Sequence, residues 1–179
     1  MPDTTLSSLF ETLKMLNSIQ SRMVGIWVDS KEIFGSEKAS FAYGNCILLY
    51  YLGFVDRTKS GRSWIWRINN DGIHFTRNLS SSDFDYRPEL RKRMLRLESF
   101  KTLLRFLKRE GVSDAYSAQK ALGSIMNSFG VRLADIGVAK KGGKGTMMKP
   151  YNPAIFPVLL RLVENVGLIS MKKNMVEML

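Results

Sequence analysis

The sequence predicts a mainly α-helical protein with a small β-hairpin in its N-terminal half. Apolar residues recur at spacings near three and four over most of the chain, which is typical of amphipathic helices. Residues 54–68 instead alternate with period two around a Lys-Ser-Gly turn, as the strands of a hairpin do. Beyond residue 87 the helical spacing returns, together with many lysines and arginines.

The chain is expected to begin with two helices of unequal length. An apolar stripe over residues 5–21 predicts a long helix that packs on the core of its own domain or, alternatively, forms a dimer interface. A one-turn helix over residues 31–34 follows, because Asp29 or Ser30 can cap its start and Gly35 can end it.

A third helix leads into the hairpin. Its apolar residues share one face up to Leu52, and Gly53 is expected to take a left-handed conformation because the chain turns sharply there. Strands are predicted over residues 54–57 and 63–68. The five residues 58–62 are expected to form the loop between them.

The order of these elements resembles the winged helix-turn-helix superfamily of DNA-binding proteins. The resemblance lies in the run from Ile47 to Arg57, the hairpin, and residues 68–72, and it covers about residues 5–78, including a fourth helix capped by Asn69. It implies a platform of helices that lays one helix in a DNA groove and holds a basic hairpin, the wing, beside it. Many prokaryotic transcription regulators belong to this superfamily.

Composition predicts a domain boundary near the middle of the chain. Residues 80–87 are polar and turn-rich, which is typical of a linker. We therefore expect a winged-helix domain over residues 1–79 and a basic helical domain over residues 88–179. In the second domain, helices are expected over about residues 88–110, 113–130 and 152–166.

The C-terminal domain contains a possible repeat of the N-terminal one. Residues 162–169 match residues 48–55 position by position in their apolar pattern. This match suggests a second winged-helix-like unit. Because so few residues follow Ile169, we expect this unit to lack a wing or to use the basic loop 139–149 in its place.

The charge of the chain predicts a polyanionic partner. The net charge is +11 over 179 residues, and the sequence pI is about 9.9. Residues 1–82 contain nine Lys/Arg and seven Asp/Glu, whereas residues 83–179 contain eighteen and nine. Most of the positive potential is therefore expected outside the N-terminal domain.

Other sequence features indicate a cytoplasmic protein that does not span a membrane. Cys46 is the only cysteine and falls on the apolar side of a predicted helix, which favours a reduced, buried thiol. The first residues lack the basic start and apolar core of a signal peptide. No apolar run approaches the roughly 18 residues of a membrane-spanning helix.

Catalytic constellations are sparse. His74 is the only histidine, which excludes a metal site built from several histidines. Asp83, Asp85 and Glu89 could hold a metal ion in a nuclease, but carboxylates in a linker and at a helix start also serve as caps. Residues 139–149 lack the spacing of a phosphate-binding Walker loop. We therefore expect a non-enzymatic protein without a cofactor or a metal.

These observations predict a protein that binds double-stranded DNA, most simply a transcription regulator. The expected contacts belong to a recognition helix, a wing and a basic C-terminal half. They are Lys38, Ser40, Tyr43 and Gly44 on the helix; Arg57, Lys59, Arg62 and Arg67 on the wing; and Arg91, Lys92, Arg93, Arg96, Lys140, Lys141 and Lys144 in the C-terminal half.

An alternative is a protein-interaction adaptor, a subunit of a transcription, replication or segregation complex. The expected recognition helix has a single cation, Lys38, and is otherwise rich in apolar and aromatic residues such as Ile47 and Tyr51. Exposed apolar patches of this kind usually meet protein. The partner would then be another protein or a second copy of the chain.

Overall fold

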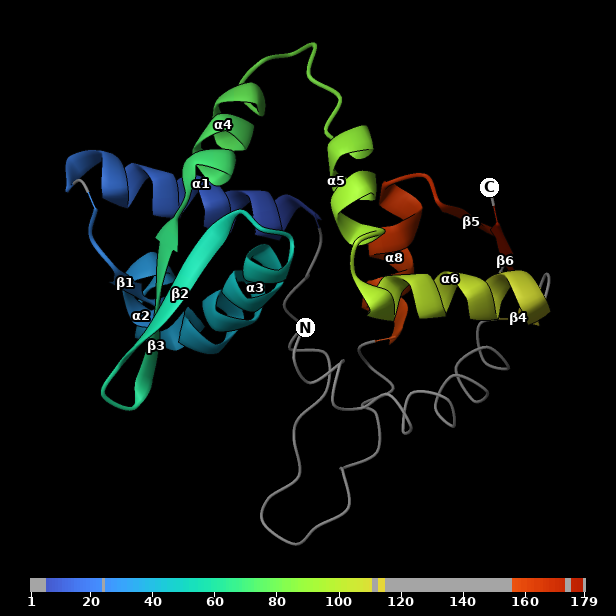
Figure 1. Cartoon of the computed structure of the whole chain (residues 1–179), viewed down its shortest axis with the longest axis horizontal. Coiled ribbons are helices and arrows are strands. Elements are labelled where there is room, and N and C mark those ends of the chain that lie inside the picture. The colour runs from blue at the N-terminus through green and yellow to red at the C-terminus, as the bar shows by residue number, and fades with distance from the viewer. Residues whose placement is uncertain (1–5, 24, 111–112, 115–155, 173–174, 179) are drawn as a thin grey trace, which may run out of the picture. The chain divides into compact units, whose positions relative to one another are not determined.

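Figure 1 shows the computed structural model of the chain, which describes residues 6–23, 25–110, 113–114, 156–172 and 175–178. These residues are mostly helical, with small antiparallel sheets, which confirms the predicted mainly α class with a β-hairpin. The chain divides into two compact units, Met1–Tyr86 (unit 1) and Arg87–Leu179 (unit 2). The division falls within the residues 80–87 that were expected to form a linker.

Unit 1 alternates helices with short strands. Its elements are α1 (Leu6–Arg22), β1 (Val28–Asp29), α2 (Ser30–Phe34), α3 (Ala39–Tyr51), β2 (Val55–Ser60), β3 (Ser63–Ile68) and α4 (Asn70–Asn78), with a single 3-10 turn over Ser36–Lys38 before α3. The strands form one antiparallel sheet in the order β1-β3-β2. The short strand before α2 therefore pairs with the second strand of the hairpin.

Local capping signals explain where the helices of unit 1 begin and end. The carboxylate of Asp29 accepts the backbone N–H of Lys31 at 2.9 Å at the start of α2. The side chain of Asn69 accepts the N–H of Gly72 at 3.0 Å at the start of α4. Gly53 follows α3 with φ of 78°, which is the left-handed conformation expected there.

The hairpin is longer, and its turn shorter, than the sequence predicted. Ser60 pairs with Ser63, so that the turn consists of Gly61 and Arg62 rather than of residues 58–62. Gly61 has φ of 57°, the left-handed conformation that two-residue hairpin turns require. The correction matters because residues expected in a loop instead hold alternating positions on paired strands.

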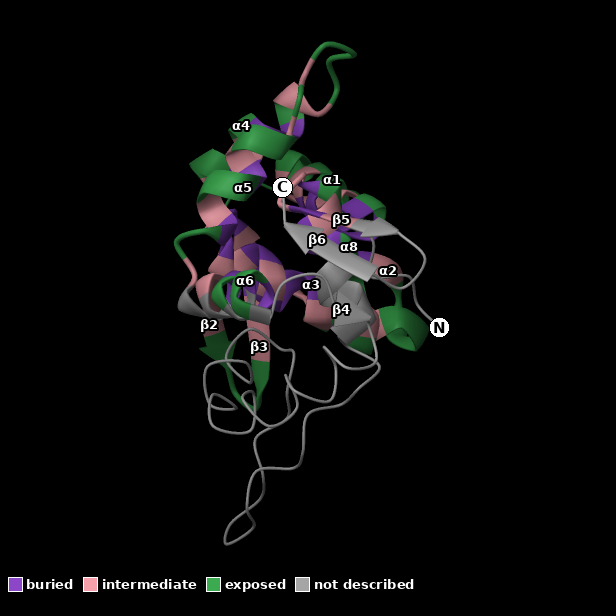
Figure 2. Ribbon diagram, turned by 90° about the vertical axis from the view of Figure 1, so that its right-hand side faces the viewer, coloured by how far each residue is buried: buried purple, intermediate pink, exposed green. Residues whose placement is uncertain are grey.

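The core of unit 1 lies where α1 and α3 pack on each other and on the sheet. Figure 2 shows its buried residues in purple, and the largest is Trp66, whose indole N–H donates to the Ser30 hydroxyl at 3.0 Å. Asn45 of α3 is also buried, and its side chain donates to the Thr12 hydroxyl of α1 at 2.9 Å. This pairing satisfies polar groups that would be costly to bury alone. Burial raises the pKa of the neighbouring Cys46 thiol well above its usual range.

Residues 80–86 pack on unit 1 through two aromatic side chains. The rings of Phe84 and Phe75 lie 5.6 Å apart, and those of Tyr86 and Phe10 lie 5.0 Å apart. Both pairs meet edge to face, an arrangement favoured by the ring quadrupoles. The segment expected to be a linker is therefore tied to the helices of unit 1 as far as Tyr86.

Unit 2 also combines helices with a three-stranded sheet. Its described elements are α5 (Arg87–Met94), α6 (Glu98–Glu110), β4 (Ser113–Asp114), α8 (Phe156–Asn165), β5 (Ile169–Lys172) and β6 (Met175–Met178). The sheet is antiparallel with the order β4-β6-β5. The sequence predicted a basic helical domain here, with a possible winged-helix-like unit, and it did not predict these three strands.

Three sequence predictions for unit 2 need correction. The helix expected over residues 88–110 is broken between Met94 and Glu98, although its apolar residues continue at helical spacing across the break. Ser113 does not open a helix, because it pairs with β6, and the remainder of the helix expected over residues 113–130 lies outside the described residues from position 115 onward. The chain end is long enough for a hairpin, since strands of four residues suffice for β5 and β6.

The two units share one order of elements. In each, a two-residue strand follows a long helix, and a later helix ends at a glycine before a hairpin. Gly53 and Gly167 have φ of 78° and 70°. At both sites the glycine N–H donates to the carbonyl three residues back, and the next N–H donates to the carbonyl five residues back. The apolar match between residues 48–55 and 162–169 thus corresponds to one repeated turn.

Candidate nucleic-acid interface

The four residues predicted for the recognition helix lie at and near the start of α3. Lys38 ends the turn before α3 and is exposed, as is Ser40. Tyr43 is 37% exposed, and Gly44 is half-buried. The spacing of Ser40, Tyr43 and Gly44 places them on one side of the helix, which they share with Ile47. Ile47, in contrast, is 7% exposed and has little surface to offer a partner.

Gly44 is unusual because it occupies the middle of a helix without a packing reason. A Cβ atom built on it meets no atom within 4 Å. We expect Gly44→Ala to raise the free energy of unfolding by about 1 kcal/mol, because alanine has the higher helix propensity. The same methyl group should weaken DNA binding if α3 approaches a groove closely. Urea unfolding and DNA titration of one preparation would test both effects, and a loss of stability would contradict the first.

One face of the hairpin carries cations stacked on aromatic rings. Arg57 is paired with Trp66 and Lys59 with Trp64, so these four side chains point to the same face, the one that packs on α3. The Arg57 guanidinium carbon lies 4.3 Å from the Tyr50 ring centroid and 4.6 Å from that of Trp64. The Lys59 Nζ lies 5.2 Å from the Trp64 centroid. Such contacts hold the cations in place along the ring faces.

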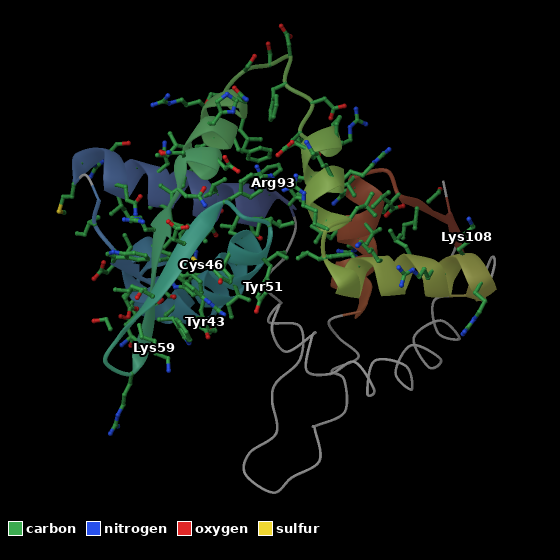
Figure 3. The ribbon with its side chains drawn as sticks, viewed as in Figure 1. Tyr43, Cys46, Tyr51, Lys59, Arg93 and Lys108 are labelled. Carbon is green, nitrogen blue, oxygen red and sulfur yellow. The ribbon has the colours of Figure 1, made fainter. Side chains whose placement is uncertain are left out.

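We call the side chains of Tyr50, Tyr51, Arg57, Lys59 and Trp64 the aromatic-cationic surface. The Tyr50 and Tyr51 rings lie 5.2 Å apart at the end of α3, and Arg57 is also 5.8 Å from the Tyr51 centroid. All five residues are half-buried or exposed. Figure 3 shows Tyr51 at the end of α3 and Lys59 near the tip of the hairpin.

The structure separates Arg67 from the other cations of the predicted wing. Arg67 is paired with Asp56 across the hairpin, so both point to the opposite face of the sheet. There its guanidinium donates to the Asp56 carboxylate at 3.0 Å and stacks 4.6 Å from the Trp27 centroid. Arg62 is exposed in the turn. Of the cations predicted to contact DNA from the hairpin, Arg57 and Lys59 therefore lie on one face of the sheet and Arg67 on the other. Arg62 lies at the tip of the hairpin.

The predicted cations of unit 2 do not form one uniform group. Arg91 donates to the carbonyl of Val166 at 2.9 and 3.2 Å and to that of Gly167 at 2.9 Å, which satisfies carbonyls at the end of α8. Arg93 pairs with Glu89. Lys92 and Arg96 are exposed to solvent. The other predicted contacts, Lys140, Lys141 and Lys144, lie outside the described residues.

Because Arg91 caps α8, its loss should destabilise unit 2. We expect Arg91→Ala to lower the free energy of unfolding by about 1 to 2 kcal/mol, since hydrogen bonds from a charged donor are lost. Hydrogen exchange of the α8 amides would report the effect, because all three tryptophans lie in unit 1. Arg96→Ala is the control, and equal exchange in both variants would contradict the capping role.

Sequence reasoning missed two exposed polar residues of α8. Arg161 and Asn165 are exposed, whereas Leu162, Val163 and Val166 are buried. In the repeat, Arg161 and Asn165 correspond to Ile47 and Tyr51 of α3. The sequence did contain a signal for their exposure, because two polar residues four positions apart in an otherwise apolar helix lie on the same face.

The structural division sharpens the division of charge. Unit 1 contains nine Lys/Arg and nine Asp/Glu, whereas unit 2 contains eighteen and seven. The entire net charge of +11 therefore belongs to unit 2. Unit 1 has no net charge with which to attract a polyanion. Its cations can favour a polyanion only locally, where several of them lie close together.

Comparison with known proteins identifies no relative: no protein-family model, curated protein or solved structure matches the chain significantly. Within the described residues, no three His, Cys, Asp or Glu side chains are placed to hold a metal ion. Of the carboxylates considered for a nuclease site, Glu89 pairs with Arg93 and Asp83 accepts the Ser82 hydroxyl. Among the helices in this part of the chain, none has the length and apolar character needed to cross a membrane.

Proposed function

We propose that the protein binds duplex DNA through two winged-helix units in tandem. The main support for this proposal is an order of elements that occurs in both units. In each unit a helix and a glycine are followed by a hairpin, and a short earlier strand pairs with the second strand of that hairpin. In helix-turn-helix proteins the corresponding helix lies in the major groove. The hairpin beside it is then positioned to contact the backbone.

Unit 2 supplies most of the affinity in this proposal. Its excess of cations would neutralise phosphates and release counterions, which is the main source of non-specific DNA binding. Exposed cations occur on several of its helices. Examples are Lys92, Lys108 and Arg161, and Arg96 is exposed in the turn between α5 and α6. The hairpin formed by β5 and β6 would act as the wing that the sequence did not predict.

Unit 1 adds directional contacts near the start of α3. The hydroxyls of Ser40 and Tyr43 can bond base edges, and Lys38 can reach a phosphate. Arg62, at the tip of the hairpin, and Lys59 would contact the backbone. A transcription regulator is the class of protein that we favour for this combination of base and phosphate contacts.

A salt titration tests the proposal. Fluorescence anisotropy of a labelled duplex, measured over a range of salt concentrations, should give a linear plot of log affinity against log salt. Each neutralised phosphate contributes about −0.9 to its slope. Light scattering in parallel would give the stoichiometry. Weak binding that barely depends on salt would reject the proposal.

A protein-interaction adaptor remains the second candidate, and the zero net charge of unit 1 favours it. Leu48 and Tyr51 are partly exposed on α3, where a protein partner or a second copy of the chain could cover them. The double variant Lys38→Ala and Tyr43→Ala separates the candidates. Loss of sequence preference with unchanged mass supports DNA reading by α3, whereas unchanged DNA binding and loss of a partner supports the adaptor.

A further inference from the structure

We propose that the aromatic-cationic surface of unit 1 binds unpaired nucleotides by stacking their bases. This inference rests on the proposed binding of nucleic acid. It adds that unit 1 prefers single-stranded to double-stranded nucleic acid. The surface brings the rings of Tyr50, Tyr51 and Trp64 to one side of unit 1, between the end of α3 and the hairpin. Tyr43 lies nearer the start of α3, where its ring meets that of Trp66 edge to face.

The exposure of these rings is the first argument. Trp66 on the same face of the hairpin is fully buried and belongs to the core, whereas Trp64, nearer the tip, keeps part of its surface in solvent. Tyr50 and Tyr51 are likewise only partly covered. A base can stack on the ring surface that Arg57 and Lys59 leave uncovered, because the π faces of a base are available only when it is unpaired.

The local charge is the second argument. Among residues 39–68 the chain has four Arg or Lys and one acidic residue, Asp56. Asp56 points to the opposite face, where it pairs with Arg67. Arg57 and Lys59 therefore act on the stacking side without a neighbouring carboxylate from this segment, and phosphates of a single strand can follow them.

The composition of α3 is the third argument. Reading a duplex groove requires polar or charged side chains directed at base edges. Beyond Gly44 the partly exposed residues of α3 are Leu48, Tyr50 and Tyr51, which offer ring faces and apolar contact instead. A neutral unit with stacking rings, joined to a strongly basic unit, suits DNA in which a duplex adjoins an unpaired strand.

The test compares three labelled probes by anisotropy: an oligo-dT strand, a blunt duplex, and a fork that joins duplex to single strand. The full chain should bind oligo-dT and should prefer the fork to the duplex. Trp64→Leu should weaken oligo-dT binding by roughly five- to a hundredfold, the range expected for loss of one stacked base. Its affinity for the blunt duplex should fall far less, because Trp64 would affect the duplex only through Lys59, which stacks on it. Trp64→Phe keeps an aromatic ring and should restore much of the binding.

Trp27→Leu is the matched control. Trp27 is also half-buried and also stacks on a guanidinium, that of Arg67, but on the opposite face of the sheet. The Trp27→Leu variant should bind all three probes as tightly as the wild-type chain does. Equal losses in the two leucine variants, or no loss in Trp64→Leu, would overturn the inference. Circular dichroism of each variant would separate misfolding from lost contacts.

The outcomes also separate this inference from the proposed function. If the wild-type chain binds duplex with a steep salt dependence but does not bind oligo-dT, the stacking inference is wrong and the proposed function stands. The aromatic-cationic surface would then be a candidate site for a protein partner. A chain that binds none of the probes refutes both. An oligo-U strand bound as tightly as oligo-dT supports stacking and adds RNA as a source of the unpaired bases.

Discussion

Replacing Gly72 with alanine is expected to lower the free energy of unfolding of unit 1 by about 2 to 3 kcal/mol, the upper part of the range for overpacked sites. A Cβ atom at this position would overlap the backbone carbonyl oxygen of Phe54 and would lie 2.6 Å from Cγ1 of Ile68. The Phe54 carbonyl has little freedom to move, because it accepts the N–H of Asn69 at 3.1 Å. Helix α4 would therefore have to shift away from the hairpin.

Urea unfolding followed by tryptophan fluorescence would measure this loss, since all three tryptophans report on unit 1. Gly44→Ala is the internal control, because it makes the same substitution in a helix where the added atom meets nothing within 4 Å. The two variants should shift the urea midpoint in opposite directions. A Gly72→Ala protein as stable as the wild type would mean that α4 does not pack this closely.

Gly72 also shows which parts of the fold could be predicted from the sequence. Local signals were sufficient for α2, α3 and α4, because their caps, Asp29, Gly53 and Asn69, act within a few residues of themselves. The reason for a glycine inside α4 is a contact with Phe54, eighteen positions earlier. A pattern of adjacent residues carries no information about such a contact.

The sheet of unit 2 escaped prediction for the same reason. Ser113 forms a strand because it pairs with Val176, from the far end of the chain. Its own neighbourhood resembles a helix start. The register of the first hairpin depends instead on a local residue. The left-handed conformation of Gly61 selects a two-residue turn and thereby places Lys59 opposite Trp64.

For the candidate site, the sequence revealed where cations occur but not what they contact. Arg91, Arg93 and Arg67 were all expected to bind DNA. In the structure the first caps a helix and the other two pair with carboxylates. The stacking of Arg57 between Tyr50 and Trp64 depends on the packing of the hairpin against α3, which composition does not encode.

Neutralising exposed cations of unit 2 should reduce DNA affinity far more than the same change in unit 1. The triple variant Lys92→Gln, Arg96→Gln and Lys108→Gln removes three exposed positive charges from α5, α6 and the turn between them. If each contacts a phosphate, the slope of log affinity against log salt should become shallower by about 0.9 per residue, or about 2.7 in total. The weakening should be similar for all duplex sequences, because phosphates carry no sequence information.

The matched control removes three exposed cations from α1 and α2 of unit 1, elements other than α3 and the hairpin: Lys14→Gln, Arg22→Gln and Lys31→Gln. Both variants have the same net charge, so a long-range effect of total charge would change them equally. A shallower slope in the unit 2 variant alone would locate the phosphate contacts there. Equal slopes would mean that the basic unit attracts DNA through its overall field and that the direct contacts lie elsewhere in the chain.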